Sequence, residues 1–155
     1  MSSNLECIIL IGLPGAGKTT FYRERFAAGH SHISKDLWPN AGGREARQQK
    51  LIDELLAGGR SIVVDNTNPT AAERARIISA AKTRGARIIG YFFDISTRAA
   101  VARNANRTGR SKVPNVAIFT TAKRLQPPKL TEGFDEVYRI ELTEDRKFRV
   151  TKVGE

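Results

Sequence analysis

The segment most suited to chemistry is GLPGAGKTT, residues 12–20, which matches the spacing G-x-x-x-x-G-K-[ST]. Such glycines let backbone N–H groups surround a phosphate chain, while the lysine meets the β- and γ-phosphates and the hydroxyl binds Mg²⁺. An apolar run precedes the segment and a helical pattern follows it, as this motif requires. The segment predicts a site for ATP or another nucleoside triphosphate with Mg²⁺, formed by Gly12, Pro14, Gly15, Ala16, Gly17, Lys18, Thr19 and Thr20.

Two carboxylates follow apolar runs and have separable roles. Asp65 closes the run 62–64, where a carboxylate that orients Mg²⁺ or its water is expected, so Thr19 and Asp65 are the predicted metal residues. Asp36 follows the short extended piece 31–34 and is expected at the end of that strand, beside the γ-phosphate, as the base for an attacking hydroxyl. A turn or helix cap is the alternative role for each residue.

The stretch RAAVARNANRTGR, residues 98–110, supplies candidate cations for the transferred phosphate. Arg103 and Arg107 are four residues apart and are predicted to share a helical face, with Arg98 and Arg110 at either end of the stretch. Phosphoryl transfer needs cations that stabilise charge on the moving group, and a lid can deliver them. A solvated basic helix face is the alternative.

The remaining pattern alternates strands and helices. Strands are predicted over residues 6–11, 31–34, 61–65, 86–94 and 137–142, with an edge strand in the tail after 143, and helices over 18–28, 44–57, 97–106 and 116–125. A further helix is expected to begin at Asn68-Pro69-Thr70, with Pro69 near its first position, and to end at Gly85. Crossover connections of this kind predict a mostly parallel sheet covered on both faces, with ligands at the carboxyl ends of the strands.

Composition restricts the partners. The 155 residues include 26 Lys and Arg against 16 Asp and Glu, a net charge of +10, which predicts an anionic partner, with nucleic acid before a membrane surface. The N-terminal residues match neither a signal peptide nor a spanning helix, so no membrane role is expected. A single cysteine, Cys7, favours a reducing cytoplasm and a buried apolar position, and His30 and His32 are interpreted as loop residues without a metal cluster.

Taken in order, the segments GLPGAGKTTF, HISKD, VVDNTNPTAAERARI, RNANRTGRSKVP and PPKLTEGFDEVYRI resemble the kinase module of polynucleotide kinases over residues 5–142. The resemblance implies a single α/β domain, residues 1–155, with the P-loop NTPase (adenylate-kinase-like) fold and a small helical lid. It also implies transfer of the γ-phosphate of ATP to the 5′-OH ends of DNA or RNA, in single strands. By the same resemblance Asp36 is the general base, Lys18 and Thr19 contact phosphate and metal, Asp65 is the acidic residue of the DNTN motif, and Arg103 and Arg107 are lid arginines.

The chain departs from that family on the acceptor side. Ser34-Lys35-Asp36 stands where the family often has Asn-Arg-Asp, and Pro39 stands where phage-type enzymes have an arginine that touches the acceptor strand. Trp38 could stack on a terminal base or simply pack. A small-molecule kinase and a nucleic-acid-binding NTPase switch therefore remain alternatives, and the preference for DNA or RNA and the oligomeric state are not readable.

Overall fold

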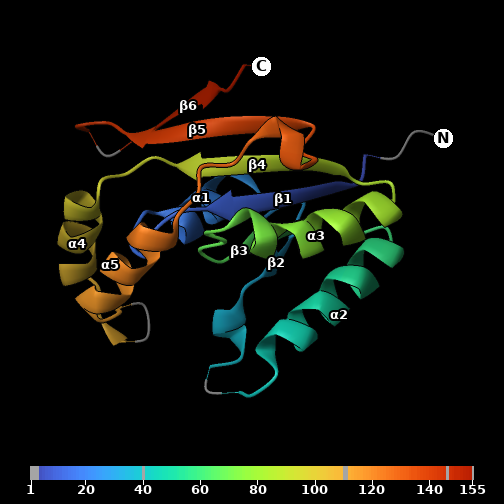
Figure 1. Cartoon of the computed structure of the whole chain (residues 1–155), viewed down its shortest axis with the longest axis horizontal. Coiled ribbons are helices and arrows are strands. Elements are labelled where there is room, and N and C mark those ends of the chain that lie inside the picture. Colours follow the sequence, from blue (N-terminus) through green and yellow to red (C-terminus); the bar gives the residue numbers. More distant parts are fainter. Residues whose placement is uncertain (1–3, 40, 110–111, 146, 155) are drawn as a thin grey trace.

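A six-stranded sheet forms the centre of the computed structural model, which describes residues 4–39, 41–109, 112–145 and 147–154 (Figure 1). Its strands lie in the order β2-β3-β1-β4-β5-β6. β1 to β5 run parallel, and β6 pairs antiparallel with β5 at the edge. The bounds are β1 Glu6–Ile11, β2 Ser31–Ile33, β3 Ile62–Asp65, β4 Arg87–Phe93, β5 Glu136–Leu142 and β6 Phe148–Lys152. The predicted mostly parallel sheet is confirmed, and so is the edge strand.

Helices cover both faces of the sheet, as predicted. α2 and α3 pack on one face and α1 on the other, while α4 and α5 pair beyond the carboxyl ends of β1 and β4 (Figure 1). The bounds are α1 Lys18–Arg25, α2 Arg44–Ala57, α3 Ala71–Thr83, α4 Thr97–Ala105 and α5 Asn115–Arg124, with short 3₁₀ turns η1 Lys35–Leu37 and η3 Leu130–Glu132. Within the described ranges, none of these helices is long and apolar enough to cross a membrane.

The central strand β1 is buried on both sides, as expected for a parallel strand between helical layers. Cys7, Ile9 and Ile11 pack toward α2 and α3, whereas Ile8 and Leu10 pack toward α1. Burial raises the pKa of the Cys7 thiol to about 12, so this cysteine is a small apolar core residue, as predicted. The apolar packing on both faces holds the end of β1, from which the phosphate-binding loop leaves, in a fixed place.

Several predicted helix boundaries differ from those in the structure. α1 ends at Arg25, because the chain leaves the helix at Phe26. α3 begins at Ala71, because the Thr70 hydroxyl accepts the Glu73 N–H at 3.2 Å and forms the cap, so Pro69 precedes the cap and is not in the first turn. α4 ends at Ala105, which leaves Arg107 outside the helix.

A buried arginine joins the two most specific segments of the sequence, DNTNP and PPKLTEGF. Arg74 is fully buried and donates to both carboxylate oxygens of Glu132, at 2.8 and 3.0 Å, and to the carbonyl of Asn68 at 2.8 Å. Asn68 adopts a left-handed φ of 44° and its amide donates to the Leu10 carbonyl at 2.7 Å. These bonds fix the turn after β3 against the end of β1, beside the glycine-rich loop.

Candidate active site

The glycine-rich loop between β1 and α1 has the shape of a phosphate-binding loop. Gly15 and Gly17 adopt φ values of +83° and +96°, and a side chain on Gly15 would meet the Ala100 carbonyl at 2.8 Å, so both positions require glycine. Gly17 caps α1 without a side-chain hydrogen bond. The first N–H groups of α1 therefore remain open to an anion at the positive end of the helix dipole.

Lys18 lies buried in this loop, where its ammonium donates to the carbonyls of Gly12 at 3.1 Å and Leu13 at 2.7 Å. Burial lowers the pKa of Lys18 to about 8, Asp65 and Asp36 oppose that shift, and Arg107 adds to it. Three of the predicted site residues thus lie within electrostatic reach of this one ammonium. Burial deprives the ammonium of hydration, and the negative charge of a bound polyphosphate would favour its charged form.

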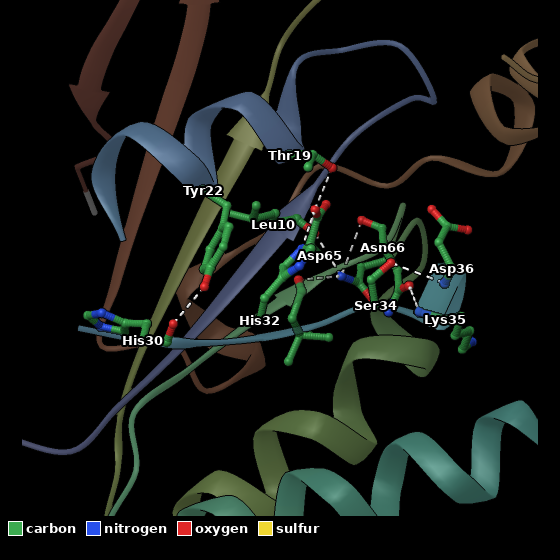
Figure 2. Close-up of polar contacts among 12 residues, drawn as sticks. Leu10, Thr19, Tyr22, His30, His32, Ser34, Lys35, Asp36, Asp65 and Asn66 are labelled. Carbon is green, nitrogen blue, oxygen red and sulfur yellow. Dashed lines mark hydrogen bonds and ion pairs between the residues drawn. The ribbon is translucent and has the colours of Figure 1, made fainter. Parts of the chain in front are cut away.

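Asp65 lies at the carboxyl end of β3 and is the centre of a hydrogen-bonded group (Figure 2). Its Oδ2 accepts from the Thr19 hydroxyl at 2.7 Å and from Nε2 of His32 at 2.8 Å. Burial favours the neutral acid, but the bonds from His32 and Thr19 and the charge of Lys18 outweigh it and hold the pKa of Asp65 below its ordinary value. The site therefore contains a buried, ionised carboxylate.

Of the two histidines that the sequence predicted as loop residues, His30 lies in the loop before β2 but His32 does not. His30 precedes β2 and pairs with Glu6 at 2.8 Å, whereas His32 lies within β2 and contacts the site through Asp65. The prediction missed His32 because its partner is remote in the sequence. The available signal was the predicted extended piece 31–34, which contains His32 and forms β2 over Ser31–Ile33.

Thr19 and Asp65 fit a magnesium ion that arrives with a nucleotide. One hydroxyl and one carboxylate, already in contact, are hard oxygen donors of the kind that Mg²⁺ prefers, and Mg²⁺ commonly takes its remaining ligands from phosphates and water. Across the described ranges, no group of three or more His, Cys, Asp or Glu side chains could hold a metal by itself. The donor set thus suits a shared metal–nucleotide site.

Asp36 lies in η1 and not at the end of β2, because the Ser34 hydroxyl accepts the Asp36 N–H at 3.2 Å and caps a 3₁₀ turn. Its side chain is exposed, and within the described part of the chain no hydrogen bond or ion pair engages the carboxylate. A free carboxylate near Lys18 is thus available to a ligand.

The turn that holds Asp36 is tied to the sheet by Asn66. Its Oδ1 accepts the Lys35 N–H at 2.9 Å (Figure 2), and its amide donates to Oε1 of the buried Gln48 at 2.6 Å. One side chain therefore connects the end of β3, η1 and α2. The sequence identified Asn66 only as part of a polar edge, and Gln48 was not identified.

The lid arginines reach the loop differently from the prediction. Arg103 in α4 donates through Nε to the Gly15 carbonyl at 2.8 Å, which places its guanidinium on the phosphate loop. Arg107 lies beyond the end of α4, so the predicted shared helical face is wrong, yet its charge acts on Lys18. Arg98 is exposed at the start of α4, and Arg110 lies outside the described residues.

The segment around Asp36 uses most of its cations in contacts within the protein. Lys35 forms an ion pair with Glu45, and Arg44 donates to the Lys35 carbonyl at 3.3 Å. The guanidinium of Arg47 lies over the ring of the half-buried Trp38, 4.7 Å from its centroid. Trp38 and Arg47 together form a flat aromatic and cationic surface next to η1.

Comparison with known proteins agrees with this arrangement. Residues 7–128 match the sequence profile of a family described as AAA domain. The chain belongs to this family. The bifunctional polynucleotide phosphatase/kinase of Schizosaccharomyces pombe is 27% identical over 143 residues, which cover 90% of this chain but only 34% of that relative. The AAA domain therefore spans about a third of that protein's length, and the predicted resemblance to polynucleotide kinases is confirmed.

Solved structures show the same fold. The AAA domain superposes on a fungal RNA kinase with a TM-score of 0.68 at 19% identity, covering 94% of this chain and 80% of that one. It superposes on a gluconokinase from Sinorhizobium meliloti 1021 with a TM-score of 0.65 at 18% identity, covering 92% and 86%. The fold is thus that of P-loop kinases, and the loop at Gly12 to Thr20 identifies a nucleotide-binding domain.

Proposed function

We propose that this AAA domain is a polynucleotide 5′-hydroxyl kinase that transfers the γ-phosphate of ATP to the 5′-OH ends of single-stranded DNA or RNA. The observation that supports the reaction type is the unengaged carboxylate of Asp36, within electrostatic reach of Lys18 in the phosphate loop. A base on the acceptor side and a cation on the donor side are the two groups that in-line transfer needs.

In the proposed reaction, the loop Gly12 to Thr20 holds the triphosphate, and Lys18 exchanges its bonds to two carbonyls for bonds to phosphate oxygens. The 5′-oxygen forms a bond to the γ-phosphorus while the bond from that phosphorus to the β,γ-bridging oxygen breaks, and ADP leaves. Asp36 takes the proton of the hydroxyl. Arg103 and Arg107 stabilise the negative charge on the transferring and leaving groups. Bound Mg²⁺, held by Thr19 and Asp65, would neutralise phosphate charge.

A nucleic acid is the proposed acceptor because of the positive net charge of the chain and its similarity to polynucleotide and RNA kinases. The net charge of +10 favours a polyanion, and the surface formed by Trp38 and Arg47 offers an aromatic ring and a cation beside Asp36. The S. pombe relative is named a polynucleotide phosphatase/kinase, and one structural neighbour is an RNA kinase. These four features support the acceptor class.

A small-molecule kinase is the second candidate, because the gluconokinase superposes nearly as well as the RNA kinase does. The donor side of the site does not distinguish these acceptors. A sugar kinase would use Asp36 in the same role and would saturate with a small acceptor whose KM is insensitive to salt.

The test measures transfer of labelled phosphate from γ-labelled ATP to 5′-OH DNA and RNA oligonucleotides and to gluconate, for the wild type, Lys18→Ala and Asp36→Asn. We expect a labelled 5′ end that both substitutions abolish, with nucleotide binding lost only in Lys18→Ala. Labelled gluconate with unlabelled oligonucleotides would favour the small-molecule kinase. Free phosphate that Asp36→Asn leaves undiminished, with no labelled acceptor, would favour an NTPase switch.

A further inference from the structure

We propose that His32 is a positioning residue that fixes the Asp65 carboxylate for the metal-bound nucleotide, a role that rests on the proposed nucleotide and metal site. The histidine does not touch the phosphate loop itself. It acts through one oxygen of Asp65, which the Thr19 hydroxyl shares.

The geometry assigns two donors to a single oxygen. The Thr19 hydroxyl and Nε2 of His32 both reach Oδ2 of Asp65, at 2.7 and 2.8 Å, and within the described residues no hydrogen bond ends on Oδ1 (Figure 2). A carboxylate oxygen accepts hydrogen bonds, so Nε2 of His32 is assigned as the donor in this contact. Two donors on one oxygen fix the rotation of the carboxylate and leave its second oxygen for another ligand.

The ring of His32 is itself held in place. It stacks on Tyr22 of α1, with centroids 4.3 Å apart and an interplanar angle of 18°. The Tyr22 hydroxyl donates to the His30 carbonyl at 2.7 Å, which holds that ring in turn. The parallel pairing of His32 with Val63 fixes the backbone beside the strand that ends in Asp65. An aromatic stack and a strand pairing therefore restrict the histidine before any ligand binds.

A hydrogen bond from His32 sets the orientation in which the Asp65 carboxylate can bind a metal. Residues that hydrogen-bond to metal ligands commonly set ligand orientation, and their loss costs about 10–100-fold in metal affinity or activity. Without His32, Asp65 keeps only the bond from Thr19 and can rotate. The loss should appear in nucleotide binding that depends on Mg²⁺, whereas nucleotide binding without metal should be unaffected.

His30 provides a matched control within the same segment. Its Nε2 lies 2.8 Å from Oε1 of Glu6, the same distance as in the His32–Asp65 pair, and its ring packs edge-on against Phe26 with centroids 5.0 Å apart. The Glu6 pair lies at the start of β1, at the opposite end of that strand from the phosphate loop. His30→Phe therefore removes an equivalent bond without touching the site.

The experiment titrates N-methylanthraniloyl-ADP into the wild type, His32→Phe, His32→Gln and His30→Phe, with MgCl₂ and with EDTA. Phenylalanine keeps the stack on Tyr22 but removes the donor, and glutamine offers a new N–H. We expect the gain in nucleotide affinity that Mg²⁺ provides to be about tenfold smaller in His32→Phe than in the wild type. The affinity measured in EDTA should be unchanged. His32→Gln should recover part of the gain, and His30→Phe should match the wild type.

Equal Mg²⁺-dependent gains in wild type and His32→Phe would overturn the proposal, and so would equal losses in His32→Phe and His30→Phe. Melting temperatures without nucleotide establish that each variant is folded, and His32→Gln decides the matter if the phenylalanine variant does not fold. Because the readout requires no acceptor, a failure of oligonucleotide phosphorylation would refute the proposed function and leave this inference standing.

Discussion

The proposed donor side and the proposed acceptor side of the site are built differently. On the donor side Lys18, Thr19 and Asp65 sit at the ends of regular elements, and each already makes hydrogen bonds within the protein. On the acceptor side Asp36 lies in a short 3₁₀ turn, exposed, with a carboxylate that no described residue engages. The donor side is preorganised by the fold, whereas the acceptor side depends on one short segment.

This difference explains how one fold can serve unlike acceptors. A gluconokinase and an RNA kinase both superpose on this domain, so proteins with these two names share its fold. In the proposed reaction, residues 34–39 and 41–47 select the acceptor, because they lie beside the site and outside the sheet. Changes on the donor side should therefore alter nucleotide binding, and changes on the acceptor side should alter transfer.

The largest expected effect separates the two sides. Asp36→Asn keeps the shape of the side chain but removes the base, so kcat for oligonucleotide phosphorylation should fall about 10²–10⁴-fold. The dissociation constant for the nucleotide should stay at the wild-type value. Steady-state kinetics together with a nucleotide titration measure both quantities, and a weaker nucleotide complex in the variant would show that the sides are not separate.

A smaller effect is expected when the hydrogen bonds of Asn66, which connect β3 to the turn that holds Asp36, are removed. Asn66→Ala releases the turn that holds Asp36 from β3, and Gln48→Ala removes the partner of the Asn66 amide. Because displacement of a reacting group by about 1 Å can cost up to about 10²-fold, kcat should fall by up to that factor in Asn66→Ala and by less in Gln48→Ala.

The adjacent Gln49→Ala is the control for that pair, because Gln49 donates to the Arg76 carbonyl on α3, away from the site. Its kcat should equal that of the wild type. Equal losses in Gln48→Ala and Gln49→Ala would mean that α2 contributes only stability.

The pKa of Lys18 predicts a pH effect confined to the donor side. In the free protein the ammonium loses its proton near pH 8, and a bound polyphosphate favours the charged form, so nucleotide affinity should fall as pH rises through that value. Between about pH 7 and pH 9 the charged fraction falls about tenfold, and the affinity should fall with it. Isothermal titration at each pH measures this, and Lys18→Met should show weak binding with no such slope.

The smallest expected effect concerns salt. If the acceptor strand makes two phosphate contacts, its KM should rise about sevenfold between about 50 and 200 mM salt. The KM for ATP should change less, because the buried Lys18 is screened less than exposed cations are. Parallel titrations of both substrates measure the two slopes. Equal slopes would remove the distinction between a polyanionic acceptor and a small one.

The sequence predicted the parts of the site that are local. Lys18 and Thr19 follow from one continuous motif, and Asp65 was predicted because a carboxylate that ends a buried strand lies at the edge where parallel strands meet. The alternation of strands and helices along the chain predicted the mostly parallel sheet, because it implies crossover connections. Each of these inferences needs only neighbours in the chain.

The parts that sequence reasoning missed depend on distant partners. His32 contacts Asp65, and Gln48 contacts Asn66, across separations that no local pattern encodes. The predicted helical face of Arg107 failed because Asn104 bonds through its side chain to the backbone of Val113, at 2.6 and 3.0 Å, and the chain turns there. A side chain that satisfies backbone groups nine residues further along the chain can end a helix before the next glycine, here Gly109.

The measurement that tests the central claim most directly is a competition between acceptors. Limiting γ-labelled ATP is given to the wild-type domain with equal concentrations of gluconate and of a 5′-OH oligonucleotide, and the oligonucleotide is afterwards digested to mononucleotides. The account predicts label on the 5′-terminal nucleotide alone, and none when the oligonucleotide already bears a 5′-phosphate. Label on gluconate, or equal label on both oligonucleotides, would contradict the assignment of a 5′-hydroxyl acceptor.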